Sequence, residues 1–281
     1  MIEKNEQHPL PEAFQFSQNN LQDYVDCPRR FQLRYVLMQP WPGLITSSPL
    51  DFEEQMQRGA RLHHLAHQYA LDLDVATLED TIVDETLKEW WHTFLHHPPP
   101  GLPQGIRAPE VNLSAPLAGY RLMAKIDLLA ADPGQRLVVV DWKTVRNPPS
   151  VATLTKRLQT IVYRYLAVEA GATFNDGRQP QPEQVEMIYW FAQRGGEIRR
   201  FPYDARQHKA ARETLTTLVD EVTAQRDPIW PLTADERNCR FCNYRSLCER
   251  GVTAGFLQDL DDDLDLPGFE IDLEQIAEVE F

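Results

Sequence analysis

The apolar residues between positions 108 and 142 fall into short runs that turn residues separate. Strands are predicted near 108–115, 120–130 and 136–142, and the third contains the uninterrupted apolar run 137–140. The sequence Asp-Pro-Gly at 132–134 is typical of a turn, so the second and third strands are expected to form a hairpin. Two further strands are predicted near 184–192 and 197–201.

Helical periodicity flanks these strands. Between Thr153 and Gly171, apolar side chains recur every three to four residues along one face, and Gly171 is a typical C-terminal stop. Other helices are predicted at about 19–36, 52–71, 78–94 and 205–224, with a Pro- and Gly-rich linker near 39–49 and a break at 98–101. The order helix, three strands, helix, strand predicts an α/β fold with a mixed central sheet between helices.

Two carboxylates lie at related places on the predicted hairpin. Asp127 comes late in the second strand, and Asp141 follows the apolar run of the third. The two can therefore converge on one hard cation such as Mg²⁺ or Mn²⁺, which prefers oxygen ligands. Lys143 projects from the same face as Asp141, where an ammonium group can orient an attacking water and offset charge on a phosphate.

The predicted helix that starts at Thr153 carries a pair of polar side chains that are candidates for the same site. Gln159 and Tyr163 are four residues apart and share one face of the helix. An amide and a phenol in this position can hold a DNA backbone or orient the catalytic strand, although half-buried polar residues without a function would look the same.

The order of these motifs resembles the PD-(D/E)xK nucleases, specifically the RecB-like branch that carries an iron-sulfur cluster. In that branch a Gly-x-x-x-His helix precedes an Asp, an Asp-x-Lys and a Gln-x-x-x-Tyr helix. The corresponding residues here are Gly59 with His63, Asp127, Asp141 with Lys143, and Gln159 with Tyr163. The resemblance covers roughly residues 17–250 and implies a restriction-endonuclease-like fold.

The resemblance also implies residue roles. His63, Asp127, Asp141 and the Trp142 carbonyl would bind Mg²⁺ or Mn²⁺, and the catalytic set would be Asp127, Asp141, Lys143, Gln159 and Tyr163. Ala124 and Trp142 depart from the usual glycine and tyrosine, but neither change removes a catalytic side chain.

Two other residues near this set leave alternatives open. Glu110 lies where relatives often have a glutamate on the first core strand, and a salt-bridging surface glutamate is the favoured alternative. His63 and His67 form an i, i+4 pair that could hold a metal, but the glutamate of a His-Glu-x-x-His zinc protease is absent, which favours His63 alone.

The cysteines indicate a second site. Cys27 lies near the N-terminus, whereas Cys239, Cys242 and Cys248 cluster near the C-terminus. Four thiolates suit either tetrahedral zinc or a [4Fe-4S] cluster, and the spacing alone does not decide between them. One N-terminal and three C-terminal cysteines resemble the iron-sulfur nucleases, as in CRISPR-associated RecB-like exonucleases and the AddB nuclease domain, and imply a [4Fe-4S] cluster that joins the two ends of the chain.

The activity that the resemblance implies is metal-dependent hydrolysis of DNA, as an exonuclease on single-stranded or frayed ends. DNA repair, recombination or CRISPR adaptation would be its setting, with a helicase or a CRISPR integration complex as partner. Arg157 and Arg164 are candidate DNA contacts. Two alternatives are a non-hydrolytic DNA-end-binding scaffold that an iron-sulfur cluster stabilises, and a zinc-stabilised hydrolase of another kind.

Charge and composition set the remaining expectations. The net charge is −14, but residues 251–281 hold ten Asp and Glu and no Lys or Arg, which leaves −4 for residues 1–250. We expect one nuclease domain over 1–250, with a helical insert at about 50–100, a catalytic core at about 108–225 and a cysteine-rich closure at 239–248. Residues 251–281 would be an acidic tail, either flexible or partner-binding. Without an apolar span or a secretory signal, a cytoplasmic protein is expected.

Overall fold

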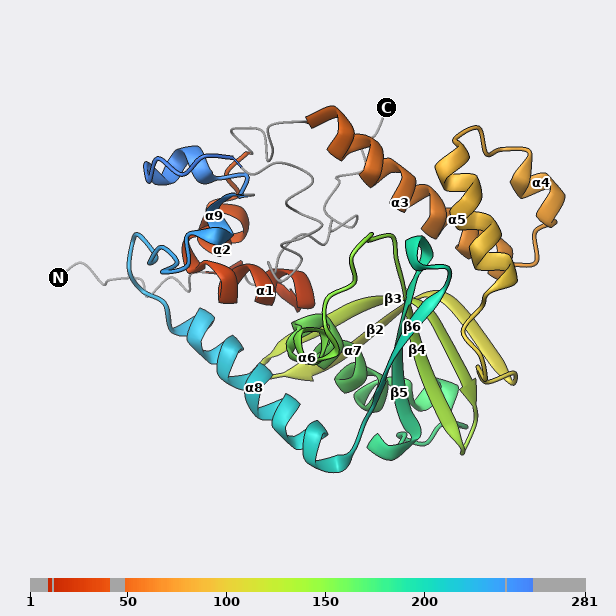
Figure 1. The fold of residues 1–281 in the computed structure, drawn as a ribbon. Coiled ribbons are helices and arrows are strands. Elements are labelled where there is room, and N and C mark those ends of the chain that lie inside the picture. Colours follow the sequence, from red (N-terminus) through yellow and green to blue (C-terminus); the bar gives the residue numbers. More distant parts are fainter. Residues whose placement is uncertain (1–9, 12, 41–48, 241, 255–281) are drawn as a thin grey trace.

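A six-stranded mixed sheet forms the centre of the protein in a computed structural model that describes residues 10–11, 13–40, 49–240 and 242–254 (Figure 1). Its strands are β1 (Gln15–Ser17), β2 (Ile106–Leu117), β3 (Tyr120–Asp132), β4 (Arg136–Lys143), β5 (Val185–Phe191) and β6 (Glu197–Pro202). The pairs β2–β3, β3–β4 and β5–β6 are antiparallel, whereas β1–β3 and β4–β5 are parallel. The predicted mixed sheet and the β3–β4 hairpin are confirmed.

Helices cover both faces of this sheet. The N-terminal part contains α1 (Gln18–Asp26), α2 (Pro28–Phe31) and a π-helical turn (Gln32–Val36), followed by α3 (Pro49–Ala70), α4 (Val75–Glu79) and α5 (Glu85–His96). After the hairpin come α6 (Val151–Lys156), α7 (Leu158–Glu169), α8 (Ala205–Ala224) and α9 (Arg237–Arg240). Short 3₁₀ turns lie at Gly171–Phe174, Pro182–Gln184, Ala192–Arg194 and Arg245–Cys248. No described helix has both the length and the apolar character needed to cross a bilayer.

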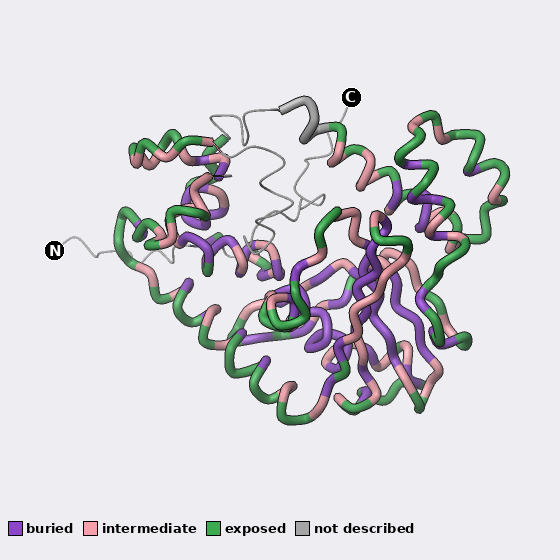
Figure 2. The backbone as a smooth tube through the Cα atoms, viewed as in Figure 1, coloured by how far each residue is buried: buried purple, intermediate pink, exposed green. Residues whose placement is uncertain are grey.

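Two buried clusters show which helices pack on which face of the sheet. Figure 2 shows that the strands of the sheet are largely buried. Residues of α1, α7 and α8 pack with Val139 of β4 and its neighbours on one face. Residues of α3 and α5 pack with Val138 and Val140 on the other face, together with a group of edge-to-face aromatic rings that includes Trp142 and Trp190. The alternation of Val138, Val139 and Val140 between the two clusters explains why this strand is apolar throughout.

Three predicted helices are broken into shorter elements, two of them at a local sequence signal. The helix predicted over 19–36 divides at Cys27, which is extended because the following residue is Pro28. The helix predicted over 78–94 is wrong, since Asp84 caps a separate α5 by accepting from the Leu87 amide. The helix predicted from Thr153 divides at Arg157, whose backbone is extended.

Two predictions concern residues that the structure does not describe. The Pro- and Gly-rich linker falls largely on residues 41–48, and the acidic tail, predicted over 251–281, falls largely on residues 255–281. Most of each segment therefore lies outside the described residues.

Candidate metal centre

The candidate metal centre lies beside a break in the pairing of β3. One edge of β3 pairs with β2 along almost its whole length. On the other edge, β1 pairs with residues 121–123 and β4 pairs with residues 128–132. Residues 124–127 lie between these two ladders, so the strands diverge here and Asp127 occupies the opening. Interrupted pairing of this kind frees space for a site within an otherwise continuous sheet.

Three side chains from separate elements meet at this opening. His63 comes from α3, Glu110 from β2 and Asp127 from β3, and one potential ligand atom from each lies within 4.8 Å of the other two. His63 Nδ1 lies 3.2 Å from Asp127 Oδ1, and Asp127 Oδ2 accepts a 2.8 Å hydrogen bond from the Trp142 amide. All three residues are half-buried. An imidazole and two carboxylates form a donor set that suits Mn²⁺ or Mg²⁺.

Glu110 is held in this group by an unusual backbone conformation. Its φ angle is +51°, within a strand whose other residues are extended. A non-glycine residue in the left-handed region costs about 1–3 kcal/mol and is most often retained at functional sites. Glu110 also forms an ion pair with Lys125. The favoured salt-bridge interpretation from the sequence is therefore incomplete, because the same carboxylate also belongs to the metal group.

Asp141 lies in an adjoining cluster instead. Its side chain is 3% exposed, Oδ1 accepts a 2.9 Å hydrogen bond from Gln159 Nε2, and Oδ2 lies 3.0 Å from Lys143 Nζ. Gln159 Nε2 also lies 3.3 Å from the Tyr163 hydroxyl. Asp141, Lys143, Gln159 and Tyr163 thus come together, and the group of His63, Glu110 and Asp127 adjoins them, since the charges of Asp141 and Lys143 both act on His63. Glu110 joins the candidate ligands, and the role of Asp141 as a metal ligand stays a prediction.

Trp142 lies between the metal group and the apolar core. Its amide fixes Asp127, and its ring is buried against Phe94 and Trp190. The predicted carbonyl ligand would come from the same residue, which links the metal centre to the apolar core under α5.

Electrostatics couple His63 to Asp127. Burial alone would lower the pKa of His63, but the adjacent Asp127 carboxylate outweighs it and raises that pKa to about 9. Burial likewise opposes ionisation of Asp127, yet the charge and hydrogen bond of His63, the Trp142 amide and the charge of Lys143 keep its pKa below the usual value. At neutral pH the metal-free site therefore holds an ionised Asp127 and a protonated His63.

This coupling predicts pH-dependent metal binding. A metal ligand must be a neutral imidazole, so a cation has to displace the His63 proton at any pH below about 9. The Mn²⁺ affinity should rise about tenfold per pH unit between pH 7 and 8.5. Calorimetric titration at several pH values measures this slope. The variant His63→Ala should bind more weakly and without the slope, whereas a flat profile for the wild-type protein would exclude His63 as a ligand.

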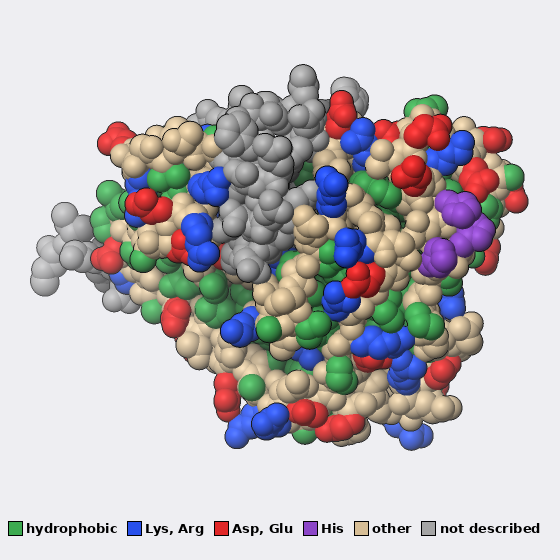
Figure 3. All heavy atoms as spheres, viewed as in Figure 1, with side chains coloured by type: hydrophobic (Ala, Val, Ile, Leu, Met, Phe, Trp, Pro, Cys, Tyr) green, Lys and Arg blue, Asp and Glu red, His purple; other side chains and the backbone are tan. Residues whose placement is uncertain are grey.

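The two candidate DNA contacts differ in position. Arg157 caps the N-terminus of α7 and is partly exposed. Arg164 is 4% exposed, donates to the carbonyl oxygens of Thr160 and Pro202, and lies over the Tyr203 ring. The prediction that Arg164 contacts DNA is therefore wrong, because its guanidinium group joins α7 to β6 inside the protein. The face in Figure 3 carries basic and acidic side chains intermixed.

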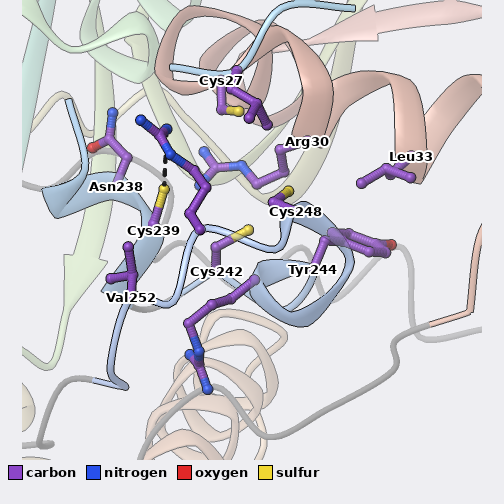
Figure 4. A pocket seen from close by; sticks show the side chains of 12 residues that line it. Cys27, Arg30, Leu33, Asn238, Cys239, Cys242, Tyr244, Cys248 and Val252 are labelled. Atoms are coloured by element: carbon purple, nitrogen blue, oxygen red, sulfur yellow. Dashed lines mark hydrogen bonds between the residues drawn. The ribbon is translucent and has the colours of Figure 1, made fainter. Parts of the chain in front are cut away.

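The four cysteines converge on one pocket (Figure 4). Cys27 lies at the junction of α1 and α2, while the other three come from α9 and the segment that follows it. Arg30 also lines the pocket and forms ion pairs with Asp23 at 2.8 Å and Asp26 at 2.5 Å. Burial raises the pKa of Cys242 to about 11, although the Arg30 charge opposes this.

A known protein family matches most of the chain. A family model described as the PD-(D/E)XK nuclease superfamily matches residues 15–249. Among solved structures, the chain is similar to SSO0001, with 14% identity over 87% of this chain and 90% of that chain and a TM-score of 0.38. It is also similar to a chain described as "Putative exonuclease" from Eubacterium rectale, with 11% identity, coverage of 87% and 92%, and a TM-score of 0.48. No curated protein sequence matches significantly.

Proposed function

The chain belongs to the PD-(D/E)XK nuclease superfamily, whose members use divalent metals, and we propose that it hydrolyses DNA at free single-stranded or frayed ends with Mg²⁺ or Mn²⁺. The convergence of His63, Glu110 and Asp127 from three separate elements carries the proposal. Such convergence of an imidazole with two carboxylates beside a lysine is the arrangement that phosphodiester hydrolysis needs.

The bound cation would supply Lewis-acid charge at the phosphate and lower the pKa of water. His63, Glu110 and Asp127 would hold it. Lys143 orients the attacking water and offsets the charge that develops on the phosphate. Lys143 is suited to this role because its side chain is only 16% exposed and its ammonium is held by Asp141 and the Tyr189 ring, so little reorganisation is needed.

Gln159 and Tyr163 act on the opposite side of Asp141. The Gln159 amide donates to Asp141 and contacts the Tyr163 hydroxyl, and Gln18 of α1 also lies within hydrogen-bond distance of that hydroxyl. These contacts hold the Asp141 carboxylate, which in turn holds Lys143. In this proposal, Gln159 and Tyr163 are positioning residues for the two charged groups.

The motif order typical of RecB-like nucleases supports cleavage at DNA ends. The test compares linear single-stranded DNA, blunt duplex and a single-stranded circle in Mn²⁺. Degradation of the linear strand with an intact circle is the expected result. Equal cutting of the circle would show an endonuclease, and DNA binding without any cleavage would favour a non-hydrolytic scaffold.

We further propose that the cysteine pocket holds a [4Fe-4S] cluster. Four converging thiolates suit either tetrahedral zinc or a cubane cluster. One N-terminal and three C-terminal cysteines are typical of iron-sulfur nucleases, and this arrangement supports the cluster.

The cations around the pocket also suit a cluster that carries negative charge. Arg30 lies beside Cys242, and Arg250 Nη1 lies 3.9 Å from Cys239 Sγ. The role proposed for the cluster is structural, because it would join segments that already contact one another: Asn238 Nδ2 donates to the Asp26 carbonyl, and the Arg29 amide donates to the Pro231 carbonyl. A covalent link between these segments closes a loop of most of the chain.

Removal of one cysteine should therefore weaken the fold. For Cys27→Ser we expect loss of the cluster's brown colour and iron, and a melting temperature roughly 10 °C lower, since a crosslink over a long loop is worth about 4–5 kcal/mol. Anaerobic purification with iron analysis and calorimetry measures both. Cys242→Ser should behave alike. A colourless wild-type protein with one bound zinc would overturn the cluster assignment.

A further inference from the structure

The metal centre contains a second lysine that the proposed mechanism does not use. Lys125 lies two residues before Asp127 on β3, so the two side chains project from the same face of the strand. Lys125 Nζ lies 2.5 Å from Glu110 Oε2. The Lys125 side chain is 42% exposed, compared with 16% for Lys143. The two lysines of the site therefore differ in their access to a large substrate.

The charges of the site are arranged in pairs. Glu110 pairs with Lys125, Asp127 with His63, and Asp141 with Lys143. A divalent cation at His63, Glu110 and Asp127 would neutralise Glu110 directly and compete with Lys125 for the same carboxylate. Lysine tolerates such a change of partner, because its ammonium has three rotatable donors on a flexible stem.

The place of Lys125 in the site determines where its ammonium can point once the metal has taken Glu110. Lys125 is anchored beside the metal group and reaches solvent, and DNA must approach the metal from solvent. Lys143, in contrast, is confined between Asp141 and the ring of Tyr189, at 3.0 Å and 5.5 Å. A phosphate oxygen that approaches the metal group therefore meets Lys125 before it meets Lys143.

We propose that Lys125 binds a backbone phosphate of the DNA substrate, and that Glu110 exchanges Lys125 for the metal when the active complex forms. This inference rests on the proposed nuclease function. The two lysines then have different roles, because Lys125 contributes to substrate affinity and Lys143 contributes to the chemical step. Glu110 Oε2 contacts Lys125, and one carboxylate oxygen of Glu110 lies within 4.8 Å of a potential ligand atom of His63 and of Asp127, so the carboxylate is within reach of both partners.

The test measures how salt affects KM for single-stranded DNA in Mn²⁺. Each phosphate contact on a single strand contributes about 0.7 to the slope of log affinity against log salt. Lys125→Ala should raise KM about tenfold and lower the slope by that amount, with kcat changed less than threefold. Lys125→Arg should restore the slope. Lys88→Ala is the matched control, because Lys88 is an exposed lysine on α5 that also pairs with a glutamate.

A purely structural role for Lys125 predicts a different pattern. If Lys125 only positions Glu110, the alanine variant should lose kcat and Mn²⁺ affinity while the salt slope stays unchanged, and the proposal is then overturned. If the wild-type protein cuts no DNA, the nuclease function fails separately. The same slope is then measured by equilibrium binding of single-stranded DNA, and an equal slope for wild type and Lys125→Ala again overturns the phosphate contact.

Discussion

Replacement of Asp127 by Asn should lower the Mn²⁺ affinity at least roughly 100-fold and cleavage about 10³-fold, without unfolding the protein. The metal loses one anionic ligand, and His63 loses the charge that raises its pKa to about 9. The fold should persist because an Asn carbonyl oxygen can still accept from the Trp142 amide, and its NH₂ group can donate to His63 Nδ1.

Calorimetric Mn²⁺ titration and cleavage rates, with the melting temperature as a check on folding, measure this prediction. Asp176→Asn is the matched control, because Asp176 is an exposed loop carboxylate whose φ angle of +53° Asn also tolerates. Unchanged Mn²⁺ affinity in Asp127→Asn would place the metal elsewhere in the protein.

Replacement of Lys143 should abolish cleavage but preserve metal binding. Lys143 lies outside the group of converging ligands, so its loss should leave Mn²⁺ affinity within a few-fold of wild type. Loss of a positioned charge at the reacting phosphate should lower kcat about 10³-fold. The combination of a lost kcat and a retained metal separates this variant from Asp127→Asn.

Folding needs a specific control in this case. Lys143→Ala leaves the buried Asp141 carboxylate without its ion pair, and an unpaired buried charge destabilises a protein. Lys143→Gln retains a hydrogen-bond donor for Asp141 and should be equally inactive while melting near the wild-type temperature. Lys209→Ala, an exposed lysine on α8, should cleave normally. A Lys143→Gln protein with wild-type kcat would remove Lys143 from the chemistry.

The sequence predicted the central architecture because the relevant signals are local. The apolar run of β4, the Asp-Pro-Gly turn and the alternation along β3 specify a hairpin without reference to the rest of the chain. The structure also brings the side chains of Asp141, Lys143, Gln159 and Tyr163 into one cluster. Breaks within helices were harder to predict, since Arg157 carries no strong helix-breaking signal.

Two features of the site depend on long-range geometry. Glu110 joins the group from a position in β2 with a positive φ angle, beside the opening in β3, and the local sequence shows neither feature. Arg164 is charged, and a charged residue on an amphipathic helix is expected to face solvent. In the structure, α8 and β6 cover that face of α7. The three-residue strand β1 was missed because it is too short to show a period, although it creates the opening beside Asp127.

The most direct test of the central claim is the cleavage of end-labelled single-stranded DNA by anaerobically purified protein as Mn²⁺ is increased. The account predicts no cleavage in EDTA, cleavage that saturates with Mn²⁺, and a shift of that saturation to much higher Mn²⁺ in Asp127→Asn. DNA that is bound but uncut at every Mn²⁺ concentration would contradict the account.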